Sequence, residues 1–71
     1  MTADTIQIDK HYKIHSLNDN EFTHRLVEMG CIKGTNITKV FQAPLGDPMA
    51  YQVDNYVLSL RIEEAKTIIV E

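Results

Sequence analysis

The chain has 71 residues, of which 44% are hydrophobic and 24% charged, and its formal net charge is −3. This length allows one domain at most, and the apolar content is too high for a disordered chain, so we expect one domain over residues 1–71. The seven Lys and Arg residues are scattered, which argues against a nucleic-acid partner.

The N-terminal residues and the apolar runs bear on localisation. No run approaches the roughly 20 apolar residues that cross a bilayer. Residues 1–5 lack the basic stretch and apolar block of a signal peptide. The single cysteine excludes an internal disulfide and suits a reducing compartment. We therefore expect a cytoplasmic protein that does not insert into a membrane.

Alternating apolar residues predict two short strands near the start of the chain. Ile6 and Ile8 alternate with polar residues in the segment 5–8, and Tyr12 and Ile14 do so in the segment 12–15. Residues 9–11 would connect these strands, although no glycine or proline marks a turn there.

A helix is predicted to follow and to end at Gly30. Asn18 is a suitable N-cap, and Glu21 three residues later would complete a capping box. Gly30 has the place of a left-handed C′ glycine. Three apolar residues recur at helical spacing and are expected to pack on the sheet: Phe22, Leu26 and Met29. Alternatively, Met29 or the neighbouring Val27 extends an exposed apolar patch for a partner.

The second half of the chain predicts three strands and a short helical turn before a last strand at 67–71. Residues 35–42 alternate imperfectly, because Val40 and Phe41 are adjacent and apolar, which indicates a bulge. Residues 49–53 and 56–60 alternate cleanly around Asp54-Asn55, a plausible tight hairpin turn. Ser59 is expected to cap the helical turn that runs through residues 64 and 65.

These elements favour a mainly β fold, a small and strongly bent antiparallel barrel of about five strands with one α-helix and a short helical turn. Closing the sheet would remove the exposed strand edges that a small domain cannot easily leave open.

The segment 43–48 contains two prolines and one glycine within six residues. Residues 44–47 predict a tight turn, with Gly46 at the position that needs positive φ and Leu45 at the tip. A rigid loop loses little entropy on docking, which favours a role in recognition. The alternative is that its prolines and glycine serve only to form the turn.

Three sequence blocks stand in the order and at the separations found in a known family. They are Arg25-Leu26-x-x-Met29-Gly30, Ala43-Pro44-Leu45-Gly46-Asp47-Pro48 and Leu58-Ser59-Leu60-Arg61-x-x-Glu64-Ala65. With Gly34, they closely resemble the FeoA family, small cytosolic proteins of the bacterial ferrous iron transport system. The resemblance is strong over residues 22–71 and weak over 5–21. The chain departs from the family pattern at residues 9–11, where a glycine turn is common, and at Cys31, where an aliphatic residue is usual.

The resemblance implies an SH3-like barrel and an accessory, regulatory role beside FeoB, a membrane transporter with a cytosolic GTP-binding region. FeoB is then the expected partner. Arg61 has two alternatives, a local pair with Glu64 or a polar contact beside the loop. The expected partner-binding residues are Met29, Pro44, Leu45, Gly46, Asp47, Pro48 and Arg61.

Catalytic and metal-binding chemistry have little support in the sequence. No spacing of serine, cysteine and histidine suggests a triad, and no phosphate-binding loop is present, so we expect no enzyme, catalytic residue or cofactor. His11 and His15 would share a face with Lys13, a poor ferrous iron site without a carboxylate, and no tight metal site is expected. The alternative function is a metal-responsive sensor that binds ferrous or another transition metal ion weakly through His11, His15 and Cys31. A third is weak self-association through the apolar loop.

Overall fold

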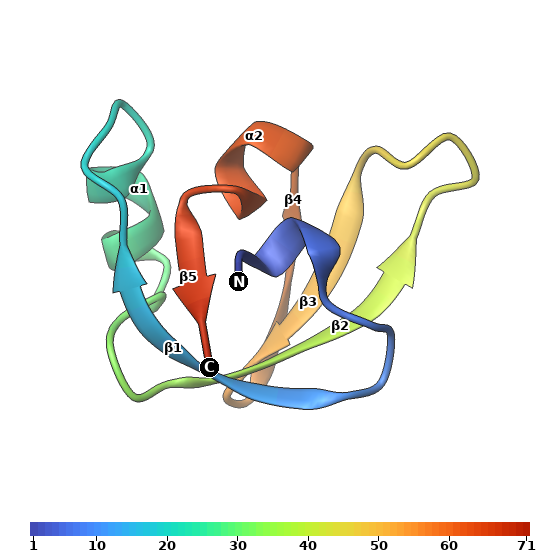
Figure 1. The fold of residues 1–71 in the computed structure, drawn as a ribbon, viewed down its shortest axis with the longest axis horizontal. Helices are drawn as coiled ribbons and strands as arrows, with labels where there is room; N and C mark the ends of the chain where they lie inside the picture. The colour runs from blue at the N-terminus through green and yellow to red at the C-terminus, as the bar shows by residue number, and fades with distance from the viewer.

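A single antiparallel sheet curves around the core of the computed structural model, which describes residues 1–71 (Figure 1). Its strands are β1 (His11–Leu17), β2 (Asn36–Gln42), β3 (Met49–Val53), β4 (Tyr56–Leu60) and β5 (Ile68–Val70). The helices are α1 (Thr23–Glu28) and α2 (Ile62–Ala65), and η1 (Ala3–Thr5) is a 3₁₀ turn. Neither α1 nor α2 has the length or the hydropathy of a bilayer-spanning helix.

The predicted fold class is confirmed: the fold is mainly β, with five strands, one α-helix and a short helical turn. The sheet order is β4-β3-β2-β1-β5, so β4 and β5 are edge strands that do not pair with each other. The sheet is therefore bent but not closed, unlike the predicted barrel. The sheet stays open because α2 connects β4 to β5 and, packed against η1, lies between these two edges (Figure 1).

The core lies on the concave side of the sheet. Strand β3 shows the predicted alternation, with Met49, Tyr51 and Val53 buried and the residues between them half-buried. Burial of apolar side chains is the main favourable contribution to folding in a domain this small. The buried apolar residues are Ala3, Ile6, Ile14, Leu26, Cys31, Ile37, Met49, Tyr51, Val53, Leu60, Ala65, Ile68 and Val70.

The strand predicted over residues 5–8 is wrong. Residues 3–5 form η1, Ile6 is buried, and Ile8 makes only an isolated bridge with Lys39 while its side chain remains 49% exposed. Asp9, in the connection to β1, adopts a positive φ of 66°. Aspartate tolerates that conformation, which explains how this connection turns without glycine.

Hydrogen bonding gives the physical reason for η1. The carbonyl oxygen of Ala3 accepts a hydrogen bond of 2.7 Å from the buried hydroxyl of Tyr51. The carbonyl oxygen of Asp4 accepts one of 2.8 Å from the buried ammonium of Lys39. Both donors lie in the interior and need acceptors there, which a 3₁₀ turn supplies from its free carbonyl end.

Helix α1 begins at Thr23, five residues after the predicted N-cap Asn18. The predicted capping box is absent, because the preceding turn uses other groups. The side-chain oxygen of Asn20 accepts a hydrogen bond from Phe22 N at 2.8 Å, and the Thr23 hydroxyl donates to Asn18 O. A local Asx-type turn thus replaces the first helical turn that the pattern predicted.

The end of α1 is as predicted. Gly30 has a φ of 96°, its N–H donates to Val27 O at 3.0 Å, and the N–H of Cys31 donates to Leu26 O at 2.9 Å. These two bonds constitute a Schellman motif, which satisfies carbonyl groups at the helix C-terminus.

The bulge and the hairpin turn are confirmed, and the cap of α2 is not. The pairing of β2 with β3 shifts register between Lys39 and Phe41. Asp54 and Asn55 connect β3 to β4 as a two-residue loop, of which only Asp54 has positive φ. The predicted cap Ser59 lies within β4, because the strand continues to Leu60 and α2 starts two residues later than Ser59 would require.

We predict that Leu26→Ala lowers the free energy of unfolding by about 2–5 kcal/mol, because it leaves a cavity where a fully buried side chain packs. Urea unfolding followed by circular dichroism measures the change. Val27→Ala is the control, since Val27 is the next residue of α1 and is 44% exposed, and its cost should stay within about 0.5 kcal/mol. Equal costs would contradict the placement of Leu26 in the core.

Candidate functional site

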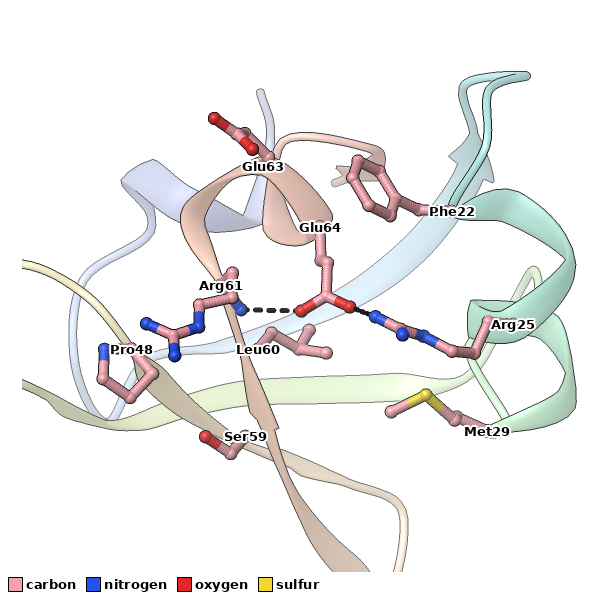
Figure 2. Close-up of a pocket in the computed structure, with 9 residues that line it drawn as sticks. All are labelled: Phe22, Arg25, Met29, Pro48, Ser59, Leu60, Arg61, Glu63 and Glu64. Carbon is pink, nitrogen blue, oxygen red and sulfur yellow. Dashed lines mark hydrogen bonds and ion pairs between the residues drawn. The ribbon is translucent and has the colours of Figure 1, made fainter.

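A surface groove of about 570 Å³ lies between α1, α2 and the end of β4 (Figure 2). We call it the groove. One wall comes from the region of α1 and the other from β4 and the residue after it, while α2 and the loop 43–48 complete the rim. Its lining residues are Phe22, Arg25, Met29, Pro48, Ser59, Leu60, Arg61, Glu63 and Glu64.

Glu64 joins the two helices across the groove. Its side chain is 8% exposed and forms an ion pair with the guanidinium of Arg25. The other carboxylate oxygen accepts a hydrogen bond from the backbone N–H of Arg61 at 2.8 Å (Figure 2). A buried carboxylate needs such partners, and removing one would leave a charge uncompensated. Arg25 therefore serves a tertiary contact that helical spacing within α1 cannot reveal.

Tyr56 makes a second contact between β4 and the region of α1. Its hydroxyl donates a hydrogen bond of 2.6 Å to Met29 O, at the C-terminus of α1. A Cβ atom at Gly30 would lie 2.0 Å from that hydroxyl oxygen, so only glycine leaves room for this contact. The hairpin of β3 and β4 is thus joined to the C-terminal end of α1.

The loop 43–48 turns one residue earlier than predicted. Gly46 N donates to Ala43 O at 2.7 Å, so the turn spans residues 43–46 and Gly46 is its fourth residue, with a φ of 95°. Pro44 then takes the second position, which suits its fixed φ. Ala43 N donates to Pro48 O at 3.0 Å and closes the base of the loop. Leu45 stands at the tip as predicted, with 97% of its surface exposed.

Asp47 connects this loop to α2. One carboxylate oxygen accepts a hydrogen bond of 3.2 Å from Ile62 N, at the first turn of α2. The other lies 3.9 Å from a guanidinium nitrogen of Arg61. The Arg61 side chain therefore lies beside the loop, while its backbone N–H bonds Glu64, and a contact of its guanidinium with a partner stays a prediction. The first turn of α2 is therefore capped both locally, by Glu64 at Arg61 N, and by the distant Asp47, which local pattern analysis cannot identify.

The structure brings together only part of the predicted partner-binding set. Met29, Pro48 and Arg61 line the groove, and Asp47 lies at its rim through the Arg61 contact. Pro44, Leu45 and Gly46 lie outside it, in the turn of the loop. The groove residues that sequence analysis did not assign to a site are Phe22, Arg25, Ser59, Leu60, Glu63 and Glu64.

The histidines and the cysteine do not form one surface site. His11 and His15 are exposed on β1, where each has an Nδ1 atom 3.1 Å from a neighbouring hydroxyl oxygen. Cys31 is fully buried, and this burial raises the pKa of its thiol to about 11. No three His, Cys, Asp or Glu side chains are grouped so that they could hold a metal ion. Cys31 therefore cannot serve as a surface metal ligand in the hypothesis of a sensor that acts through surface His and Cys residues.

Comparison with known proteins gives consistent matches. A model of the FeoA domain matches residues 1–71. Iron(II) transport protein A from Clostridium thermocellum is 35% identical with a TM-score of 0.93, over 100% of this chain and 44% of that chain. FeoA from Stenotrophomonas maltophilia, solved in complex with zinc and described as a prokaryotic SH3 domain protein, is 30% identical with a TM-score of 0.90, over 100% of this chain and 89% of that chain.

A curated relative from Porphyromonas gingivalis is an Fe(2+) transport protein A/Fe(2+) transporter FeoB fusion protein. It is 48% identical over 50 residues, which are 70% of this chain and 6% of that protein. This chain therefore corresponds to a small part of that relative's length.

The bent five-stranded sheet and its groove define a small SH3-like domain. The chain belongs to the FeoA family, whose members are linked to ferrous iron transport.

We predict that Gly30→Ala destabilises the fold more than Gly34→Ala does. Both glycines have positive φ, so each substitution carries backbone strain of about 1–2 kcal/mol. Only the Cβ at position 30 would also displace the Tyr56 hydroxyl, since no atom lies within 4 Å of a Cβ at position 34. Urea unfolding measures both. The excess cost at Gly30 should shrink in a Tyr56→Phe background, and an unchanged excess would refute the steric explanation.

We also predict that Cys31 makes the fold less stable in alkali. Its thiol has an ordinary pKa of 9.0, which burial raises to about 11. Between these values the unfolded chain has lost a proton that the native state retains, so the free energy of unfolding falls as pH rises. Below pH 9 this contribution is constant. Urea unfolding of the wild type and Cys31→Ala from about pH 8 to about pH 11 should show a steeper decline in the wild type, and parallel curves would contradict the prediction.

Proposed function

We propose that this chain is a non-enzymatic accessory protein of ferrous iron uptake, which binds the cytosolic GTP-binding region of a FeoB transporter and regulates its uptake. In this proposal it acts in the cytoplasm as one domain over residues 1–71. The observation that carries the proposal is the fusion protein of Porphyromonas gingivalis, in which a segment 48% identical to this chain shares one polypeptide with an Fe(2+) transporter. Two functions joined in one chain are expected to act on each other.

The proposed docking surface is the loop 43–48 together with the groove. Leu45 is almost fully exposed at the tip, where it offers apolar area without a fold-stabilising role. The loop is held at its base by the Ala43–Pro48 hydrogen bond and on its flank by Asp47. A loop held in this way loses little conformational entropy when it binds, which favours recognition.

Charged groups at the groove would give the surface its selectivity. The side chains of Arg25 and Arg61 are 61% and 70% exposed, although each also has a carboxylate neighbour. Met29 is half-buried in the wall beside them. The surface thus combines apolar area with two guanidinium groups, a combination that is typical of protein interfaces.

An amide NMR titration of the full chain with the isolated cytosolic region of the transporter tests this proposal. It should be run with GDP and with a GTP analogue. We expect shifts at residues 43–48, at the end of α1 and at Arg61, and a difference between the two nucleotides. No shift in either nucleotide state, or shifts confined to the outer face of the sheet, would overturn the proposal.

We predict that Leu45→Asp weakens this binding by at least about tenfold, because a carboxylate replaces the apolar group that docks. The fold should remain intact, since the native side chain is 97% exposed. Leu45→Met is the matched control, which keeps the apolar bulk and should bind like the wild type. Isothermal titration calorimetry measures affinity, and the amide spectrum verifies the fold. Unfolding of Leu45→Asp would show that the loop tip is structural.

A further inference from the structure

The two edges of the sheet are treated differently. The β5 edge is covered by the N-terminus, because Val70 N donates to Met1 O at 2.9 Å and Thr2 forms an antiparallel bridge with Ile69. At the other edge β4 pairs only with β3, and no isolated bridge covers its outer side. An exposed edge strand is a template for pairing with another chain.

The register identifies which backbone groups of β4 are free. The N–H of Asp54, just after β3, donates to the carbonyl oxygen of Asn36 in β2, so the backbone groups of Asp54 point toward β2. Gln52, two residues earlier on β3, points the same way. In an antiparallel ladder the direction alternates, so Tyr51 and Val53 face β4. They pair there with Leu58 and Tyr56, respectively.

Val57 and Ser59 consequently direct their N–H and C=O groups away from β3, toward the open edge. No turn, loop or cap hydrogen bond of the structure involves either residue. Two residues on one side of a strand, each with a free donor and a free acceptor, match the backbone of an added extended chain.

The composition of β4 does not protect this edge. Natural edge strands are commonly blocked by charged residues, proline or a bulge. The sequence of β4 is Tyr-Val-Leu-Ser-Leu, without charge or proline, and its register with β3 is unbroken. The side chain of Val57, within β4, is 58% exposed.

The groove adjoins the C-terminal end of this open edge. Ser59 and Leu60 belong to its lining, Met29 lies on the α1 side of Leu60, and Phe22 lies beside Glu64 (Figure 2). Alternate side chains of an added strand point to the same face. On the concave face they would enter the groove, so the edge supplies main-chain hydrogen bonds and the groove supplies side-chain contacts.

We infer that β4 is a strand-addition site, and that its occupant is an extended segment of the transporter's cytosolic region with apolar residues at alternate positions. This inference rests on the proposed function. The site is continuous with the proposed docking surface, because Met29, Pro48 and Arg61 line the groove. A second copy of the chain fits less well. The inward side chains of its β4, Leu58 and Leu60, already pack in its own core. They could not enter the groove of the first copy.

Amide hydrogen exchange of the full chain, alone and with the transporter's cytosolic region, tests the inference. In the free protein the Val57 and Ser59 amides should exchange quickly, and the Leu58 amide, which faces β3, slowly. In the complex, exchange at Val57 and Ser59 should slow by at least about tenfold. Ser59→Pro, which removes the free N–H, should weaken binding by at least about tenfold, whereas the matched control Ser59→Ala should not. If Ser59→Pro fails to fold, the exchange measurement decides alone.

Each other outcome has a distinct meaning. A complex that shifts residues 43–48 but leaves Val57 and Ser59 unprotected overturns strand addition and leaves the proposed function standing. Absence of any complex overturns both. Protection that appears without the transporter, as the concentration of the chain is raised, overturns the occupant in favour of a second copy.

Discussion

The buried hydroxyl of Tyr51 and the buried ammonium of Lys39 both require acceptors inside the fold, and the N-terminal 3₁₀ turn supplies them. An unsatisfied buried donor costs about 1–3 kcal/mol, a large share of the stability of a domain this small. Burial raises the pKa of Tyr51, while burial lowers the pKa of Lys39 and the nearby Asp4 carboxylate opposes that shift. The N-terminal 3₁₀ turn thus covers the open side of the sheet and also supplies the acceptors that the buried donors require.

The hydrogen bonds of the buried Lys39 ammonium also connect to the loop 43–48. Lys39 donates a second hydrogen bond, of 3.1 Å, to the side-chain oxygen of Gln42, and the amide nitrogen of Gln42 lies 3.5 Å from Gly46 O. A continuous chain of polar contacts therefore leads from the N-terminal turn to the loop. The groove depends on contacts of the same kind, from Glu64 and Tyr56, because helices of six and four residues do not hold their own positions in water.

Period-two alternation identified β3 and β4 correctly, because their residues face the core on one side and their hairpin is local. The bulge near Val40 and the glycine end of α1 were also readable, since each has a local chemical cause. The conformation at the start of the chain was not predictable from the sequence, because it depends on hydrogen-bond donors from β2 and β3. Of the predicted partner-binding residues, Met29, Pro48 and Arg61 line the groove, and Leu45 is exposed at the loop tip. Arg25 with Glu64 and Asp47 with Ile62 are long-range pairs without a local pattern.

The hydrogen bond between Val70 and Met1 places the two ends of the described chain side by side (Figure 1). A tether attached at either end would therefore leave the domain from the same place, and the order of domains in a fused polypeptide would matter little to its reach. Short flexible tethers give effective concentrations on the order of millimolar. In such a fusion even a small docking surface of modest intrinsic affinity would remain occupied most of the time.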